Sequence, residues 1–397
     1  MNRSELNIAV IGAGPAGLTL ALLASELLPL AQVSLFDART AEHDIAGDPR
    51  TLALSLGSVQ LLQRLQCWPD ALAQSISEVH VSQDSPALAA TFGPAEVRLR
   101  AQDLGVERLG AVLTHGALVA ELQRGWLAAV GAATGRLHSH FGQPVRGIKN
   151  LGGAVEVDAG VAQVFDLAVV AEGGVFADQA RKSVVRDYQQ TAWVGTAEIE
   201  GATPGLAIER FTRHGPAALL PLPLRPGTPA RAALVWCVDS RDDPVRDLSD
   251  AQRLAVLNTL FPPAAGRLVG LSPLKSFALG LNAERSLVQG RSVRIGNAAQ
   301  TLHPVAGQGL NLGLRDAFSL VDTLRWRGGD IDAALRRVEW ARAPDRWAMI
   351  GATDFLARSF TWQWPGLAAL RGFGLAALNG AGPLKNALAR RMMFGSR

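Results

Sequence analysis

The feature that most constrains the fold of this chain is a glycine-rich turn near its start, which separates two apolar stretches. The turn is Gly12-Ala-Gly-Pro-Ala-Gly17. We predict a buried strand over Leu6–Ile11, a helix over Ala16–Leu28 and a second strand over Gln32–Asp37, because apolar runs of suitable length flank the turn. A strand, a glycine turn, a helix and a strand that ends in an acidic residue are typical of a βαβ unit that binds a dinucleotide.

Each glycine of this turn, and the acidic residue after it, has its own role in binding a dinucleotide. Gly12 permits the tight turn, and Gly14 lets the backbone approach a pyrophosphate. Gly17, which follows Ala16, allows the helix and the strand to pack closely. Asp37 can accept hydrogen bonds from ribose hydroxyls. A glycine turn in an unrelated α/β protein is the alternative interpretation, because the GxGxxG pattern alone is a weak signal.

A second glycine loop follows a strand predicted over Ser292–Ile295, far along the chain. It contains Pro304, Gly307 and Gly309, and an amphipathic helix that carries Asn311 begins near Gly309. Such a loop leaves backbone N–H groups free, and the start of a helix attracts negative charge. Two anion-binding turns so far apart predict one extended cofactor, which favours a flavin dinucleotide over a nicotinamide.

Three further residues are candidates for the same site. Arg50 precedes a predicted helix and can reach a pyrophosphate or the flavin edge, or it is a solvated loop arginine. Glu172 and Gly173 follow the strand predicted over Val164–Val170. The carboxyl end of a parallel strand lies on the ligand side of a sheet, although a simple turn is the alternative. His303 can be a general base, but a role in holding the loop is favoured.

Composition excludes several classes of protein. The 397 residues are 48% apolar and carry a net charge of +4, without a basic stripe interleaved with aromatic residues, so we expect no nucleic-acid partner. Cys67 and Cys237 have no paired spacing, and the histidines lack metal-binding spacing, which predicts neither disulfide nor metal. No apolar run is long enough to span a membrane. We therefore expect a cytoplasmic protein.

The chain is predicted to form an α/β fold with a second domain inserted into a Rossmann-like first domain. The dinucleotide-binding domain is assigned to residues 1–75, 100–182 and 273–345. Residues 76–99 and 183–272 alternate strand-like segments with Pro- and Gly-rich turns, which indicates a predominantly antiparallel substrate-binding sheet. Residues 346–397 form a helical C-terminal tail with basic side chains and the aromatic residues Phe355, Phe360, Trp362, Trp364, Phe373 and Phe394.

In the order and spacing of these motifs the chain resembles the group A flavoprotein monooxygenases of the para-hydroxybenzoate hydroxylase type. That family has GxGxxG at its start, a strand ending in Asp-Gly, and Gly-Asp followed by a Pro-x-x-Gly-x-Gly-x-Asn loop. Here Glu172 replaces the usual Asp, and Asn297 replaces the acid of Gly-Asp. Within the family, Gly296–Pro304, Gly307–Asp316 and Glu209–Pro216 are most similar to the hydroxylases of ubiquinone biosynthesis.

The resemblance implies FAD as the cofactor and assigns its contacts. The three glycines of the first turn would hold the pyrophosphate, and Asp37 would hold the adenosine ribose. Ala16, in the same turn, is also assigned to cofactor binding. A second group of residues would line the ribityl–pyrophosphate stretch: Arg50, Glu172, Gly173, Gly296 and Asn297. A third group would face the isoalloxazine: Pro304, Gly307, Gly309, Leu310 and Asn311. No catalytic side chain is assigned with certainty, because the chemistry belongs to the flavin.

The resemblance also implies an activity. NADPH or NADH would reduce the flavin, O2 would add at its C4a atom, and the resulting hydroperoxide would hydroxylate a polyprenylated phenol, 2-polyprenyl-6-methoxyphenol. Phe211, His214, Leu219 and Pro221 are the candidate substrate contacts. The tail would contact the inner-membrane surface, other quinone-biosynthesis proteins, or the protein itself, alone or in an oligomer. The alternatives are a hydroxylase or epoxidase for another apolar substrate, and a non-catalytic FAD-binding scaffold.

Overall fold

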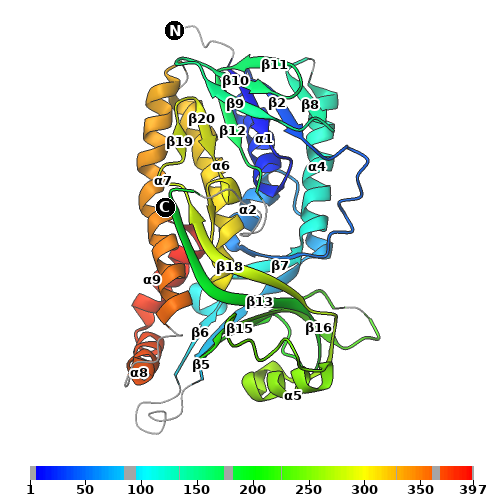
Figure 1. Cartoon of the computed structure of the whole chain (residues 1–397), viewed down its shortest axis with the longest axis vertical. Coiled ribbons are helices and arrows are strands. Elements are labelled where there is room, and N and C mark those ends of the chain that lie inside the picture. Colours follow the sequence, from blue (N-terminus) through cyan, green and yellow to red (C-terminus); the bar gives the residue numbers. More distant parts are fainter. Residues whose placement is uncertain are drawn as a thin grey trace.

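The structure is a computed structural model that describes residues 6–84, 95–133, 135–173, 182–224, 226–327, 329–359 and 367–395. In Figure 1 a domain of strands flanked by long helices lies above a large curved sheet. Phe360, Trp362 and Trp364 of the predicted tail lie outside the described residues.

The upper domain is built on a six-stranded sheet in the order β19-β20-β12-β1-β2-β8. All its neighbouring strands are parallel except β19 and β20, which form an antiparallel pair. The strands are β1 (Asn7–Ile11), β2 (Gln32–Asp37), β8 (Leu137–Phe141), β12 (Leu167–Val170), β19 (Val288–Gln289) and β20 (Ser292–Arg294). The predicted βαβ unit is present, with α1 (Pro15–Leu27) between β1 and β2.

The lower domain contains a larger sheet, which forms the wall of the pocket described below. Its order is β21-β18-β13-β16-β15-β14-β5-β6, and β17 also pairs with β13. Its pairs are antiparallel except for β14 with β5. The strands are β5 (Glu78–Gln83), β6 (Glu96–Arg100), β13 (Val184–Glu200), β14 (Leu206–Thr212), β15 (Gly215–Pro221), β16 (Ala230–Asp239), β17 (Arg267–Leu271), β18 (Lys275–Ala283) and β21 (Gln300–Thr301).

Two smaller sheets and a set of helices complete the fold. The smaller sheets are β9 (Gly147–Asn150), β10 (Val155–Asp158) and β11 (Ala162–Phe165), and β3 (Thr51–Ser55), β4 (Gln74–Ile76) and β7 (Gly110–Thr114). The helices are α2 (Leu56–Arg64), α4 (His115–Ala132), α5 (Asp250–Leu260), α6 (Gln308–Arg327), α7 (Ile331–Ser359), α8 (Leu367–Gly380) and α9 (Gly382–Phe394). The largest core lies between the six-stranded sheet and α1, α4 and α6.

Three predicted boundaries differ from the structure. The single strand expected over Val164–Val170 is two strands, because Asp166 accepts a hydrogen bond from the backbone N–H of Asn7 (2.8 Å) and separates β11 from β12. The domain boundary expected at residue 272 precedes β18, which pairs with β13 and therefore extends the large sheet to Ala283. The boundary expected at residue 345 falls inside α7, which continues through Pro344.

A buried ionic cluster joins α6 to α7 behind the second glycine loop. Arg342 of α7 bonds Asp316 of α6 (2.7 Å) and Asp345 (2.8 Å). Arg315 also lies against Asp345 (3.3 Å) and donates to the carbonyl of Met392 in α9 (2.8 Å). Removing one partner of such a cluster leaves a buried charge unpaired, so the cluster fixes the relative positions of these helices.

Candidate active site

The first glycine turn has the close packing that its sequence predicts. Gly12 has φ +101°, and a Cβ at Gly17 would lie 1.9 Å from the carbonyl oxygen of Gly12, so only glycine fits. A Cβ at Gly14 would meet no protein atom within 4 Å. The backbone of Gly14 therefore borders open space at the N-terminus of α1, as a turn that approaches a pyrophosphate requires.

Asp37 is buried at the end of β2, where its carboxylate organises the turn. One oxygen accepts from the N–H of Ala13 (2.5 Å), and the other accepts from the backbone N–H and the guanidinium of Arg39. Arg39 in turn donates to the carbonyl of Ala13 (2.7 Å). The oxygen that accepts from Ala13 has further acceptor capacity, so these contacts are compatible with a ribose hydroxyl at the same group.

Glu172 and Gly173 lie against the two glycine segments. A Cβ at Gly12 would lie 2.8 Å from Glu172, and a Cβ at Gly173 would lie 2.2 Å from the Cβ of Asn297. Burial, and secondly the charge of Asp37, raise the pKa of Glu172. The strand end predicted to face a ligand therefore lies beside both loops.

The second loop brings the start of α6 close to α1. Gly296 and Gly307 have φ values of +57° and +58°, which favour glycine. A Cβ at Gly313 would lie 2.8 Å from Gly296 Cα, and Ala16 of α1 lies against the same point. A Cβ at Gly309 would meet nothing within 4 Å. The N-termini of α1 and α6 thus each have open space beside a glycine, Gly14 and Gly309. Together they form a cradle for an elongated anionic cofactor.

Asn311 holds this loop rather than offering a free amide to a ligand. Its side-chain oxygen accepts from the N–H of Ser55 (2.8 Å) and the hydroxyl of Ser58 (2.7 Å). Its amide nitrogen donates to the carbonyls of Ala53 (3.1 Å) and Gly307 (2.9 Å). Four bonds use the usual capacity of the amide, so its place beside a flavin is that of a positioning residue. Leu310 packs against the main core.

His303 holds the second glycine loop in place, which is the role favoured over that of a general base. Its Nδ1 accepts from the N–H of Val305 (3.2 Å), so Nε2 carries the proton and donates to Gln190 (2.9 Å). Burial lowers its pKa to about 3. A histidine that is neutral and bonded at both nitrogens is a poor candidate for a general base.

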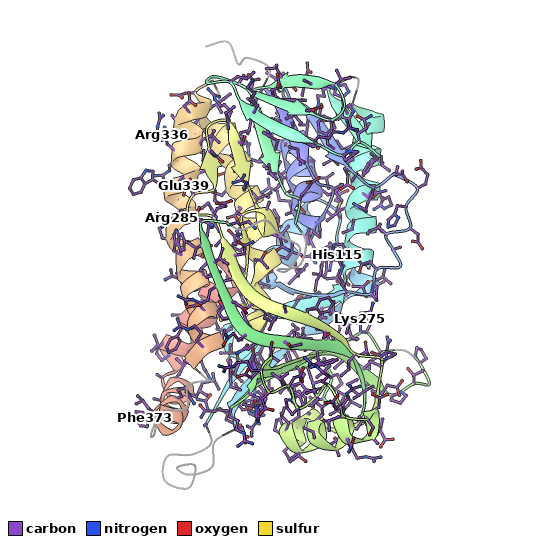
Figure 2. All side chains as sticks on the ribbon, viewed as in Figure 1. His115, Lys275, Arg285, Arg336, Glu339 and Phe373 are labelled. Carbon is purple, nitrogen blue, oxygen red and sulfur yellow. The ribbon has the colours of Figure 1, made fainter. Side chains whose placement is uncertain are left out.

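Arg50 lies in a charged group at the start of α4. It bonds Asp48 (2.6 Å) and lies beside His115, and its side chain is 63% exposed. Burial and then the charge of Arg50 lower the pKa of His115 to about 4; Arg39 of the first turn also contributes. Arg50 and Arg39 thus share one neighbourhood. Figure 2 shows His115 facing the middle of the molecule.

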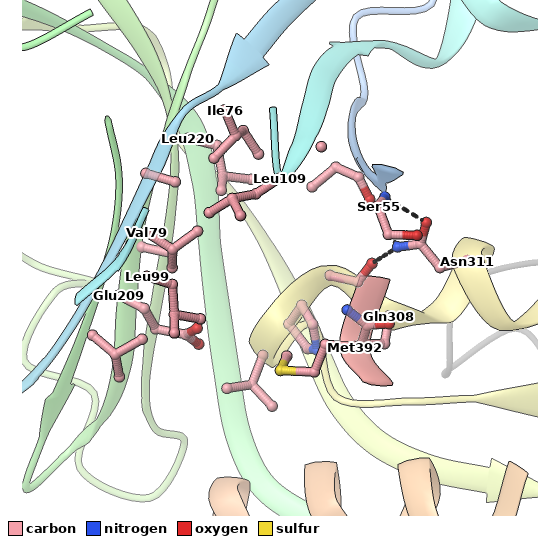
Figure 3. A pocket seen from close by; sticks show the side chains of 18 of the residues that line it. Ser55, Ile76, Val79, Leu99, Leu109, Glu209, Leu220, Gln308, Asn311 and Met392 are labelled. Atoms are coloured by element: carbon pink, nitrogen blue, oxygen red, sulfur yellow. Dashed lines mark hydrogen bonds between the residues drawn. The ribbon is translucent and has the colours of Figure 1, made fainter. Parts of the chain in front are cut away.

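A pocket lies between the large sheet and the second glycine loop. Its cavity volume is about 210 Å³, it is partly open to solvent, and its walls are mainly apolar. Figure 3 shows Val79, Leu99 and Glu209 on the sheet wall, and Gln308 and Asn311 opposite. The loop wall includes Pro304 and Gly307, two of the residues predicted to face an isoalloxazine. The pocket therefore adjoins the cradle and suits an apolar substrate.

The predicted substrate contacts do not line this pocket. Leu219 and Pro221 point to the opposite face of β15, toward the core beneath α5 or a separate small pocket, because side chains alternate along a strand. Phe211 packs beneath the loop against Val305. His214 lies in the turn between β14 and β15, bonded to Arg213 (2.9 Å). The four residues predicted to contact the substrate therefore lie outside the lining of this pocket, and their role stays a prediction.

Sequence reasoning missed residues on both walls. On β15 the pocket-facing residues are Pro216, Ala218 and Leu220, one register position from those predicted. Met392 and Met393 of α9 also line the pocket, and a Cβ at Gly57 would lie 2.8 Å from the Met393 carbonyl oxygen. The strand alternation was available as a signal, whereas no local pattern places the C-terminal helix at this pocket.

Comparison with known proteins identifies the family. A family model described as an FAD binding domain matches residues 184–336. The chain is 30% identical over 410 residues to ubiquinone hydroxylase UbiL of Rhodospirillum rubrum. This match covers 98% of this chain and 89% of that protein. The chain belongs to the FAD-dependent aromatic hydroxylases. The hydroxylase is also 28% identical to the 3-demethoxyubiquinol 3-hydroxylase of Escherichia coli, over 97% of both chains.

The fold of the hydroxylase agrees with this assignment. The crystal structure of Klebsiella pneumoniae HpxO complexed with FAD and uric acid matches with a TM-score of 0.69 at 17% identity, over 100% of this chain and 98% of that chain. The predicted family, fold class and FAD cofactor are confirmed, and the hydroxylase is an NAD(P)H-dependent monooxygenase. Among the described residues, no helix is long and apolar enough to cross a membrane.

Proposed function

We propose that the hydroxylase adds one hydroxyl group to the aromatic ring of a polyprenylated phenol in ubiquinone biosynthesis. The observation that carries this proposal is the apolar pocket between the sheet and the second glycine loop, which is large enough for a substituted ring and the start of an apolar tail. Relatives named for ubiquinone hydroxylation over nearly the whole chain support the pathway.

The residues of both loops fit FAD. The cradle of Gly12, Gly14 and Gly17 and the N-terminus of α1 would hold the pyrophosphate, and Asp37 the ribose. The loop from Pro304 to Gly309 would face the isoalloxazine. When bound and reduced by NADPH or NADH, FAD activates O2 and supplies one oxygen atom to the ring. The apolar walls keep water from that reaction.

Among polyprenylated phenols we favour 2-polyprenyl-6-methoxyphenol. Deleting the gene and analysing lipid extracts by mass spectrometry tests this choice. We expect this phenol to accumulate and ubiquinone to fall, with both restored by the wild-type gene. Accumulation of a later, demethoxy intermediate would move the substrate to the step named for the Escherichia coli relative. Normal ubiquinone in a strain without a redundant hydroxylase would contradict the pathway while leaving the enzyme class in place.

The C-terminal helices support contact with an anionic membrane surface, where such a substrate resides. Residues 367–395 contain four basic residues and no acidic residue. Leu370 and Phe373 of α8 and Leu384 and Leu388 of α9 are between 45% and 65% exposed. Phe373 lies at the outer edge of α8 in Figure 2. Another side of α9 lines the pocket through the buried Ala389 and Met393, so one helix connects the exposed apolar surface with the pocket.

A further inference from the structure

One buried glutamine links the large sheet and α7 to the second glycine loop. Gln190 of β13 is only 4% exposed, and its amide is bonded at both ends. The amide oxygen accepts from Nε2 of His303 in the loop (2.9 Å), and the amide nitrogen donates to the carbonyl of Ala357 in α7 (3.3 Å). Gln190 therefore connects three elements, although it does not line the apolar pocket itself.

The two ends of this chain of hydrogen bonds fix the direction of every bond in it. The Ala357 carbonyl can only accept, so the amide nitrogen of Gln190 faces α7 and the amide oxygen faces His303. At the other end, the backbone N–H of Val305 can only donate, so Nδ1 of His303 is its acceptor (3.2 Å). The imidazole is therefore neutral, and a second proton on Nδ1 would face the Val305 N–H.

A β-bulge brings this glutamine and a tyrosine to the histidine. β13 pairs with β18 up to Asp187 and again from Gln190. The two residues between them, Tyr188 and Gln189, are extra in this register, and Gln189 has φ +52°. Bulges redirect side chains and are common beside active sites. The Tyr188 ring lies edge-on to the His303 ring, with centroids 5.4 Å apart, so the bulge directs two side chains onto one imidazole.

The backbone that His303 holds belongs to the wall of the pocket, because Pro304, Val305 and Gly307 all line it. The Val305 side chain packs with Phe211 of the large sheet and with Leu356 of α7. Its backbone N–H is bonded to the imidazole, which Gln190 ties to the same sheet and the same helix. Both attachments of Val305 therefore lead to the large sheet and to α7.

Resting on the proposed placement of the isoalloxazine beside this loop, we propose that Gln190 is a positioning residue for FAD. It holds the imidazole of His303 neutral and in one orientation, and the imidazole holds the Val305 backbone where the flavin ring binds. The inserted sheet thus sets the shape of the loop as well as one wall of the pocket. Since the imidazole carries no charge, the start of α6 remains the group that attracts negative charge at this loop.

The charged groups packed near this histidine act on Tyr188. Asp354 of α7 and Arg186 of β13 form an ion pair (2.5 Å), and Arg358 lies on Asp354 as well (3.5 Å). Burial, and secondly the charge of Asp354, raise the pKa of Tyr188. The pKa of His303 is lowered by burial. The neutral state of the imidazole therefore depends on its burial and on the direction of its bonds.

A double-mutant cycle tests whether Gln190 acts through His303. Gln190→Leu removes both amide bonds, and we expect the dissociation constant of FAD to rise roughly 10-fold, because the loop loses a buried hydrogen bond. In a His303→Leu background, the same change should alter this constant by less than about twofold, since the link is already absent. Thr353→Val is the matched control in α7: its hydroxyl bonds only carbonyls of that helix, so FAD affinity should stay at the wild-type value.

Hydrogen exchange at the Val305 N–H, measured by NMR with and without FAD, reports on the loop directly. This amide should exchange roughly 10-fold faster in Gln190→Leu than in the wild type or in Thr353→Val. Unchanged exchange, or an equal loss of FAD affinity in both backgrounds, overturns this inference alone. Faster exchange with wild-type FAD affinity overturns the placement of the flavin at this loop, and the inference with it.

The nitrogen-15 shifts of the His303 imidazole give a second readout that packing alone does not determine. In the wild-type holoenzyme at pH 6, below the ordinary pKa of 6.5, the ring should be neutral with its proton on Nε2. His303→Leu assigns the signal by its loss. A charged ring, or a proton on Nδ1, overturns the inference, because Val305 would then have no acceptor in the imidazole.

Discussion

Gly14 differs from its neighbours in the first turn because nothing in the protein fills the space before it. Gly14→Val would place a branched side chain where a pyrophosphate must approach. We expect the purified variant to contain little or no FAD, measured by flavin absorbance after denaturation. Gly131→Val, at another glycine with open space but on the exposed end of α4, should retain FAD. Wild-type flavin content in Gly14→Val would contradict the assignment of this turn.

His303 makes stability depend on pH at the scale of one residue. Its folded pKa of about 3 lies below the ordinary value of 6.5, so acid protonates the unfolded state first and stability falls as the pH drops below about 6.5. This group contributes up to about 1.4 kcal/mol per pH unit. Urea unfolding at several pH values between pH 6 and pH 4.5 tests this. The free energy of unfolding should fall less steeply with falling pH in His303→Asn than in the wild type. An unchanged slope would show that the histidine is protonated when folded.

At the scale of elements, Asn311 links α6 to β3, to α2 and to the turn at Gly307. Asn311→Ala leaves several buried partners without bonds and should cost about 2–4 kcal/mol in urea unfolding. FAD affinity should also fall, because the loop before α6 is no longer held. Asn258→Ala is the matched control: this amide bonds Leu254 and Leu268 beside α5, so its loss should reduce stability without reducing FAD affinity.

At the scale of the whole molecule, α8 lies at the opposite end from β11, and α9 leads from there toward the middle of the molecule (Figure 1). Leu384→Glu with Leu388→Glu places two acids on the exposed apolar side of α9. We expect this double variant to lose most cosedimentation with vesicles that contain anionic lipid, while its FAD content stays normal. Val164→Glu, at an exposed position on β11, should cosediment like the wild type. Equal cosedimentation of all three proteins would exclude α9 as the contact.

The sequence by itself determined the elements whose signals are local. The βαβ unit around Gly12–Gly17, the strand before Glu172 and the start of α6 near Gly309 all depend on apolar runs and on glycines that few other residues can replace. The inserted antiparallel sheet followed from turns between alternating segments. These features could be predicted because backbone sterics and burial act over a few residues.

Only the tertiary structure decided which side chains meet. Leu219 and Leu220 look equivalent in the sequence, but the pairing of β15 with β14 and β16 turns Leu220 to the pocket and Leu219 to the other core. Asn311 bonds residues more than 250 positions away, and Met392 reaches the pocket from the last helix. Such contacts depend on how whole elements pack, because residues distant in the chain share a wall only after the sheets and helices have assembled.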